Sequence, residues 1–237
     1  MLKTILKRIP GVSTAYHFAR RYYVSRMSAE KIFTDIYRKK CWLGVGSDDL
    51  TQMQRIIEKL LGLFTRWNIK TVLDIPCGDF WWMRQVPLGD VQYLGADIVG
   101  DLITLNRKKY ETTKVSFSVM NLVAQELPQV DLIICRDCLV HFSYSDIFRA
   151  LRNICNSGSK HLLTTTFYDR NLNRDIVTGE WRPLNLGISP LNFPPSLELI
   201  VEGNTEGNGA YKDKSLALWR ISDIKRQSFG LKNKQLS

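Results

Sequence analysis

The sequence predicts an α/β domain built on a mostly parallel sheet. Short strand-like runs alternate with amphipathic helical patterns, and within one domain this alternation indicates parallel strands joined by right-handed crossovers. With 237 residues, of which 44% are apolar and 24% charged, the chain can form one such domain with appendages and bury a sizeable core. No apolar run approaches the roughly 20 residues that span a bilayer.

The first half of the expected domain begins with a helix. Ser47-Asp48-Asp49 precedes apolar residues at helical spacing over residues 50–64, which predicts a capped amphipathic helix. A second helical pattern covers Asp101–Tyr110. Two strand-like runs precede that pattern and two follow it: Thr71–Ile75, Val91–Asp97, Val115–Met120 and Val130–Cys135.

The second half repeats this alternation once and then changes. Ser143 starts a capping-box-like helix, and Lys160–Phe167 is the expected fifth strand. Residues 168–196 are rich in Pro and Asn, which predicts a long ordered loop at the sheet edge. Leu197–Val201 and Ser215–Ile221 then predict an antiparallel hairpin that closes the sheet.

The positive charge is concentrated in an N-terminal arm. The net charge is +10, and residues 1–40 carry ten Lys or Arg side chains against only two acidic ones. We therefore expect a basic helical arm (1–45), a main domain (46–224) and a polar C-terminal tail (225–237). Because the main domain carries little net charge, nucleic acid is not an expected partner.

The arm has two alternative roles. Residues 13–27 interleave aromatic side chains with arginines, a pattern that favours contact with an anionic membrane surface. Alternatively, the arm is a helix that caps the main domain and leaves its basic face in water.

The five cysteines predict a reduced, cytoplasmic protein. Their number is odd and their sequence contexts are apolar or strand-like, so a disulfide framework is not expected. Cys135-x-x-Cys138 lacks a second ligand pair at zinc-finger spacing, and no metal site is expected there. If the arm binds lipid, the protein would be peripheral at the inner membrane surface.

The turn after the first strand indicates the kind of ligand. A strand ending in Asp74, followed by a turn with Gly78, resembles the entry to a nucleotide pocket in an open α/β sheet. Pro76 removes a backbone N–H, Phe80 is expected to block close approach, and Asp79 would repel a pyrophosphate. These features favour a cationic, phosphate-free nucleoside such as S-adenosylmethionine, whose sulfonium and ammonium groups attract carboxylates.

Polar side chains also follow the next two strands. Asp97 ends the second strand, where an acid about 20 residues past the glycine turn can bind ribose hydroxyls. Asn121 follows the third strand and can either contact the adenine edge or only make a turn. Asp79 can likewise contact the cofactor or cap the following helix.

The fourth strand delivers Arg136, Asp137 and His141 to the same edge of the sheet. His141 can act as a general base toward an acceptor hydroxyl, or it can be a structural histidine. Asp137 can order His141 or contact the amino group of the cofactor. Arg136 is a candidate for cofactor binding that can instead pair with a carboxylate such as Asp74.

Two later polar and aromatic segments are candidates for acceptor recognition. Arg182 lies in the first of them, and Asn208 and Tyr211 lie in the second. These side chains can recognise a sugar or a carboxylate, or they can lock their loops by hydrogen bonds.

In their order and spacing, these segments resemble a bacterial family of class I S-adenosylmethionine-dependent methyltransferases. The resemblance extends over roughly residues 30–224, although no single segment is specific. Six segments carry it: Leu73–Met83 (LDIPCGDFWWM), Gly95–Ile103 (GADIVGDLI), Asp131–Ser143, Thr164–Phe167, Asp175–Leu186 and Glu206–Trp219.

The resemblance implies a Rossmann-like fold with a seven-stranded sheet in the order 3-2-1-4-5-7-6 and an antiparallel strand 7. It also implies that Asp74 and Gly78 line the methionine end of the cofactor and that Asp97 binds the ribose. Tyr37–Ser47, with Trp42, is similar to the family's cofactor-covering entry, in a shortened form.

The expected activity is therefore methyl transfer from S-adenosylmethionine, with O-methylation of a small-molecule or glycan-type acceptor. No Asn/Asp-Pro-Pro-Tyr/Phe motif follows the fourth strand, which disfavours a nucleobase amine as the acceptor. Two rival classes are a module that binds the cofactor without turnover and an NAD-type oxidoreductase. The oxidoreductase would need phosphate donors that the turn after the first strand lacks.

If the arm binds membranes, the full chain will co-sediment with anionic vesicles. Added salt will weaken this binding, because the Debye length falls to about 3 Å at 1 M ionic strength. A variant that lacks residues 1–26 is the control, and equal co-sedimentation of that variant would refute the membrane role.

Overall fold

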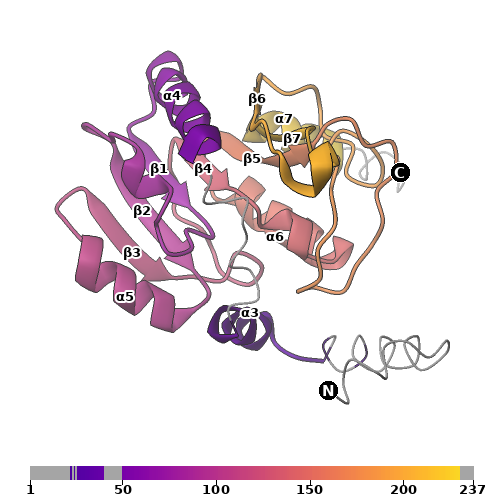
Figure 1. Cartoon of the computed structure of the whole chain (residues 1–237), viewed down its shortest axis with the longest axis horizontal. Coiled ribbons are helices and arrows are strands. Elements are labelled where there is room, and N and C mark those ends of the chain that lie inside the picture. The colour runs from indigo at the N-terminus through magenta and orange to yellow at the C-terminus, as the bar shows by residue number, and fades with distance from the viewer. Residues whose placement is uncertain (1–21, 23, 25, 40–49, 230–237) are drawn as a thin grey trace, which may run out of the picture.

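The computed structural model describes residues 22, 24, 26–39 and 50–229 (Figure 1). In this part of the chain the helices are α3 (Ala29–Arg38), α4 (Leu50–Arg66), α5 (Gly100–Tyr110), α6 (Tyr144–Asn156) and α7 (Ile221–Phe229). The strands are β1 (Thr71–Asp74), β2 (Gln92–Asp97), β3 (Val115–Val119), β4 (Leu132–Cys135), β5 (His161–Phe167), β6 (Glu198–Val201) and β7 (Lys214–Arg220).

The strands form one sheet in the order β3-β2-β1-β4-β5-β7-β6. The five strands from β3 to β5 pair in parallel, whereas β7 is antiparallel to both β5 and β6. Every residue of β4 and β5 is buried, as expected for central strands covered on both faces. The predicted seven-stranded topology is confirmed.

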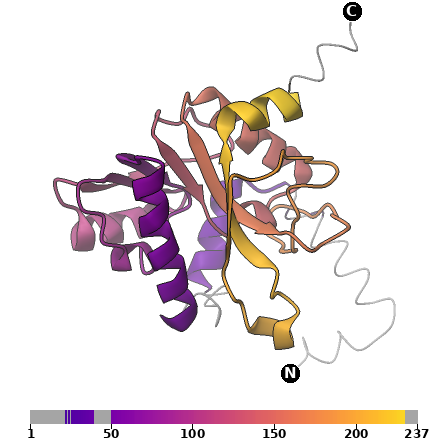
Figure 2. The same cartoon turned by 90° about the horizontal axis from the view of Figure 1, so that it is seen from above.

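Helices cover both faces of this sheet, with α4 and α6 on opposite sides (Figures 1 and 2). Neighbouring residues of β1 show the division, because side chains alternate between the two faces of a strand. Val72 packs into the core that contains α4, whereas Leu73 packs into the core that contains α6 and α7.

Two helix starts were predicted from capping patterns. Ser143 caps α6 as expected, since its hydroxyl accepts a hydrogen bond from the backbone N–H of Asp146 at 3.2 Å. The expected cap of α4, Ser47–Asp49, lies outside the described residues, as does most of the N-terminal arm.

The long loop predicted over 168–196 is confirmed, because none of these residues, all of which the structure describes, belongs to a helix or a strand. Apolar anchors hold it against the sheet. Leu184, Leu186 and Phe193 are buried in the core beside α6. The loop is therefore ordered by burial.

The C-terminal region differs from the expectation of a polar tail that starts at residue 225. α7 begins directly after β7 and runs through that position. Ile221 and Ile224, at helical spacing, are buried against α6 and its neighbours. Among the side chains of this helix that the structure describes, only these two are apolar anchors, and so short a pattern does not distinguish a helix from a tail in the sequence.

In the part of the chain that the structure describes, no helix combines the length and the apolar character needed to cross a bilayer.

The burial of α7 gives a test of the fold. Ile224 is fully buried, so Ile224→Ala should lower the free energy of unfolding by about 2–5 kcal/mol through lost transfer energy and a cavity. Chemical denaturation measures this change. Ser222→Ala, at an exposed position of the same helix, should change the free energy by less than about 0.5 kcal/mol. Equal stabilities of the two variants would contradict the packing of α7.

Candidate functional site

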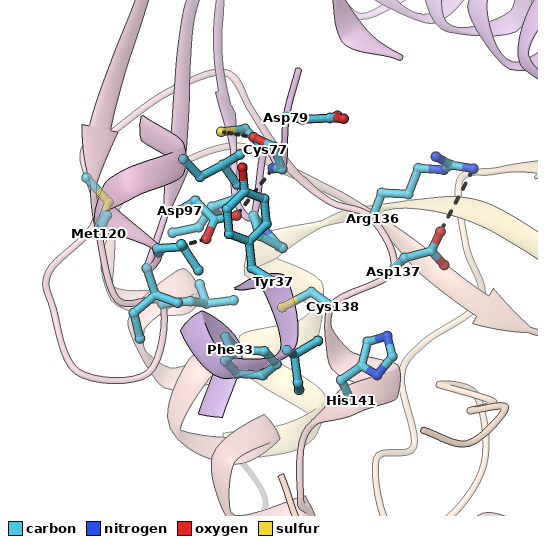
Figure 3. A pocket seen from close by; sticks show the side chains of 18 of the residues that line it. Phe33, Tyr37, Cys77, Asp79, Asp97, Met120, Arg136, Asp137, Cys138 and His141 are labelled. Atoms are coloured by element: carbon cyan, nitrogen blue, oxygen red, sulfur yellow. Dashed lines mark hydrogen bonds and ion pairs between the residues drawn. The ribbon is translucent and has the colours of Figure 1, made fainter. Parts of the chain in front are cut away.

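A cavity of about 610 Å³ lies at the carboxyl ends of the parallel strands (Figure 3). Residues that follow β1, β2, β3 and β4 line it: Ile75–Asp79, Asp97–Val99, Met120–Leu122 and Arg136–Cys138. After β1 the chain crosses to one side of the sheet, and after β4 to the other. Ligands of open α/β sheets bind in the crevice at such a switch point.

The turn after β1 leaves room for a ligand beside Gly78. This residue has a φ of 55°, a left-handed conformation that favours glycine, and a Cβ there would meet no heavy atom within 4 Å. Its N–H donates a hydrogen bond to the Asp97 carboxylate at 3.3 Å. Its carbonyl accepts one from the Asn106 side chain at 2.8 Å. The turn is thus fixed from two sides while its inner surface stays open.

Asp97, at the end of β2, places a nearly buried carboxylate on the cavity wall. Its second oxygen accepts a hydrogen bond from the N–H of Val99 at 3.0 Å. Burial raises the pKa of Asp97 above its usual value, while the N–H groups of Val99 and Gly78 act in the opposite direction. Each oxygen has lone pairs beyond these bonds, so the carboxylate can accept hydrogen bonds from ligand hydroxyls.

Asp74 lies behind the cavity and is not among its lining residues. Its carboxylate is fully buried, and one oxygen accepts a hydrogen bond from the hydroxyl of Tyr93 at 2.7 Å. The other oxygen has no hydrogen-bond partner. Burial raises the pKa of Asp74 to about 7, although the Tyr93 hydroxyl and the charge of Arg136 favour the ionised form.

The expectation that Phe80 blocks the turn is wrong. Phe80 is buried with a φ of 63°, and its ring centroid lies 5.1 Å from those of Tyr93 and Phe117. This aromatic cluster turns the side chain away from the cavity. Asp79 does line the cavity, and its carboxylate also accepts a hydrogen bond from the N–H of Trp81 at 3.0 Å.

Asn121 makes a turn, which is one of its two predicted alternatives, and it does so at the wall of the cavity. It lines the cavity after β3, and its side-chain oxygen accepts a hydrogen bond from the N–H of Val123 at 2.9 Å. The amide group therefore makes a turn at the position where it borders the cavity.

The floor of the cavity is charged. The Arg136 guanidinium forms two hydrogen bonds to Glu202, at 2.9 and 3.3 Å, and not the pair with Asp74 that the sequence suggested. Asp137 accepts a hydrogen bond from the Lys214 ammonium group at 2.7 Å. Burial alone would raise the pKa of Asp137, but Lys214 and Arg136 lower it to about 2.

His141 also lines the cavity, in a short 3₁₀ helix after β4 (Leu139–His141). Its Nδ1 lies 3.0 Å from the carbonyl oxygen of Glu180. Because a carbonyl only accepts, Nδ1 carries the hydrogen, and Nε2 is the proton-accepting nitrogen of the ring. Burial lowers the pKa of His141 to about 4, so the ring is neutral near pH 7.

Arg182 lies outside the cavity lining and is nearly buried. Its guanidinium donates hydrogen bonds to the carbonyls of Leu139, Phe142 and Arg174, at 3.0, 2.8 and 3.1 Å. These contacts match the loop-locking alternative, and they hold the segment that carries His141.

The structure does not bring the other two acceptor candidates into the cavity lining. Asn208 is exposed in a 3₁₀ turn (Glu206–Gly209) with a φ of 54°. Tyr211 packs in an aromatic cluster, with its ring centroid 5.0 Å from that of Trp181 and 6.1 Å from that of Phe167.

Helix α3 forms a wall that the sequence predicted only in part. Phe33 and Tyr37 of this helix line the cavity, and Figure 3 shows Tyr37 extending toward Asp97. Phe33 belongs to the apolar face of α3, but the sequence does not show which surface of the protein this face covers. Tyr37 begins the expected covering segment, whose Trp42 lies outside the described residues.

A close approach fixes α3 to the long loop. Gly179 has a φ of 98°, and a Cβ there would lie 2.5 Å from a methyl group of Ile32 on α3. The N–H of Gly179 donates to the carbonyl of His141 at 2.8 Å. The loop therefore contacts the helix on one side and the histidine segment on the other.

These features fit S-adenosylmethionine. The open space at Gly78 and the carboxylate of Asp97 provide a place for the ribose, and Val99, Leu102 and Leu122 provide apolar walls for a nucleobase. The volume of about 610 Å³ lies within the range of cofactor pockets. Among the residues that the structure describes, no three His, Cys, Asp or Glu side chains gather as a metal site.

Comparison with known proteins agrees with a site for S-adenosylmethionine. Residues 72–158 match a family model described as a methyltransferase domain. No curated protein matches the chain.

Solved structures of methyltransferases share the fold. Magnesium protoporphyrin IX methyltransferase (ChlM) from Synechocystis PCC 6803, with bound SAM, has a TM-score of 0.57 at 12% identity, covering 82% of this chain and 97% of its own. The N-methyltransferase NodS from Bradyrhizobium japonicum WM9 has a TM-score of 0.54 at 17% identity, covering 73% and 98%. Human N-acetylserotonin methyltransferase has a TM-score of 0.51 at 14% identity, covering 90% and 68%. The chain therefore contains a segment that matches a methyltransferase domain, and it has the fold of class I S-adenosylmethionine-dependent methyltransferases.

Proposed function

We propose that this methyltransferase methylates a hydroxyl group of a small-molecule or glycan-type acceptor, with His141 as the general base. The observation that carries the proposal is the state of His141. Its ring lines the cavity, is neutral near pH 7, and presents Nε2 as the proton acceptor. A hydroxyl nucleophile loses a proton as its bond to the methyl group forms, whereas an amine that is already neutral needs no base at that step.

The cofactor supplies an activated methyl group on a sulfonium leaving group, so the protein has mainly to position two partners and exclude water. We propose that Asp97 accepts hydrogen bonds from the ribose and that Gly78, Asp79 and Asn121 border the nucleoside. Asp137, ionised at the cavity floor, is suited to bind the cofactor's ammonium group.

The structurally similar proteins do not indicate which acceptor this protein methylates. The names of these proteins refer to a magnesium porphyrin, to N-acetylserotonin and to N-methylation, which differ in chemistry. The proposal of O-methylation therefore depends on His141 alone. The free, buried state of Cys77, Cys135, Cys138 and Cys155 supports a reducing compartment such as the cytoplasm as its place of action.

Asp97→Ala should weaken binding of S-adenosylmethionine by at least about tenfold, because it removes a charged acceptor from the cavity wall. Isothermal titration calorimetry measures the dissociation constant. Asp90→Ala is the control, since that side chain is exposed and pairs only with Lys114 at the surface among its described contacts. Wild-type affinity in the Asp97 variant would sink the assignment, and tighter binding of NAD than of S-adenosylmethionine would favour the oxidoreductase.

His141→Gln should lower kcat by about 10²–10⁴-fold while leaving cofactor affinity near that of the wild type. Release of S-adenosylhomocysteine with a panel of sugars, phenols and amines measures turnover. No turnover with any of them, despite cofactor binding, would favour the non-catalytic module. Turnover with amines only would contradict O-methylation.

The pH profile tests the state of His141 directly. A base whose pKa is about 4 is active only when deprotonated, so the rate should rise as pH passes through that value and be level by pH 6. An acidic limb centred near 6.5, the ordinary pKa of histidine, would show that the ring is not held as described.

A further inference from the structure

Two charged residues outside the cavity hold the charged groups at its floor. Glu202, which follows β6, receives the two hydrogen bonds of Arg136. Lys214, the first residue of β7, lies 2.7 Å from an oxygen of Asp137 and 3.5 Å from Glu202. The side chains of Glu202 and Lys214 are only 2% and 13% exposed.

These four side chains form a network with balanced charge. Arg136 and Lys214 are cations, Asp137 and Glu202 are anions, and Arg136 also lies 3.9 Å from Asp137. The backbone joins the outer pair, since the N–H of Glu202 donates to the carbonyl of Lys214 at 3.0 Å. Burying such charges costs free energy unless each is paired, and here each one is.

Within this network, the Oδ1 atom of Asp137 can accept a hydrogen bond from a ligand. Lys214 binds its Oδ2, while the one hydrogen bond of Oδ1 with a described residue is a long contact of 3.4 Å with the hydroxyl of Thr165. The side chain is 34% exposed and lines the cavity. Its backbone, at a φ of 51°, is fixed by an N–H bond to the Thr165 hydroxyl at 2.7 Å. Among the described residues, Arg136, Lys214, His141 and the thiol of Cys138 are the charged or titratable groups that interact with this carboxylate.

We propose that Lys214 and Glu202 are positioning residues of the methyl-transfer site: Lys214 anchors the Asp137 carboxylate with Oδ1 toward the cavity, and Glu202 cancels the surplus positive charge. The inference depends on the proposed binding of the cofactor's ammonium group by Asp137. Without Glu202, two cations would oppose one carboxylate at the floor, and this surplus would repel a cationic cofactor.

The first test measures Asp137 itself, without any ligand. A carboxyl ¹³C NMR titration of the wild type should show no Asp137 transition above pH 4. In Lys214→Gln, which keeps a hydrogen-bond donor but removes the charge, the midpoint should move up by about one to three pH units. Lys212→Gln, at an exposed position two residues away, should leave it unchanged. An unchanged midpoint in Lys214→Gln would overturn the role of Lys214.

The second test measures binding of S-adenosylmethionine by calorimetry at several pH values. Relative to the wild type, Lys214→Gln should lose about tenfold in affinity as pH falls through the new midpoint. Lys214→Arg should restore the wild-type profile. In an Asp137→Asn background the extra loss should vanish, and its persistence there would show that Lys214 does not act through Asp137.

The role of Glu202 has its own readout. Glu202→Gln should weaken S-adenosylmethionine by about tenfold and S-adenosylhomocysteine by less, because the product lacks the sulfonium charge. Glu198→Gln, in the strand β6 that precedes Glu202 and paired with Arg66, is the matched control. Equal losses for the two ligands would contradict charge cancellation. Circular dichroism confirms that each variant is folded.

The failure of this inference and that of the proposed function are distinguishable. Wild-type cofactor affinity in Asp137→Asn would refute the proposed contact of Asp137, whatever the NMR titration shows. A shifted midpoint together with that result would leave Lys214 as an anchor without a role in binding, and this would overturn its place in the methyl-transfer site.

Discussion

The parallel pairing of β2, β1 and β4 is the constraint on which the site depends. Parallel strands present their carboxyl ends at one edge, so the polar residues that follow three separate strands meet there. The bond from the N–H of Gly78 to the carboxylate of Asp97 then ties the first of these ends to the second. A cofactor site can form here because strand direction brings together groups that are far apart in the sequence.

Around that edge lie three carboxylates that are buried or partly buried, and each is stabilised in a different way. Asp97 is held by backbone N–H groups, and the carboxylate of Asp137 by cations. Asp74 accepts one hydrogen bond, from Tyr93, and among the described residues its other oxygen has no partner. Burial therefore raises its pKa to about 7, and a large fraction of this carboxyl group is protonated at neutral pH. Burial of an ionised side chain costs free energy because the group loses its hydration. Hydrogen bonds or opposite charges lower this cost by stabilising the ionised form.

The strands and their order could be predicted from the sequence because their signals are local or carried by several segments together. Gly78 and Asp97 could be found for the same reason, since each has a fixed place after an apolar run. The side chain of Phe80 could not be placed, because an aromatic cluster formed by distant strands decides its direction.

Glu202 and Lys214 were missed although both lie at strand ends, where Asp97 was recognised. The signal of a lone charge beside an apolar strand was present, but its partners lie 66 and 77 residues away. For Arg182 the sequence left two alternatives open for a related reason: a buried guanidinium that donates to backbone carbonyls has the same sequence signature as one that binds a substrate.

The contacts of Gly179 link helix α3 to the segment that carries His141. The backbone there is wedged between Ile32 of α3 and the carbonyl of His141, with no space for even a methyl group on the helix side. Displacement of α3 from the cavity would therefore relax the loop that orients the histidine. The position of α3 at the cavity and the position of the His141 segment are therefore coupled through the backbone of one glycine.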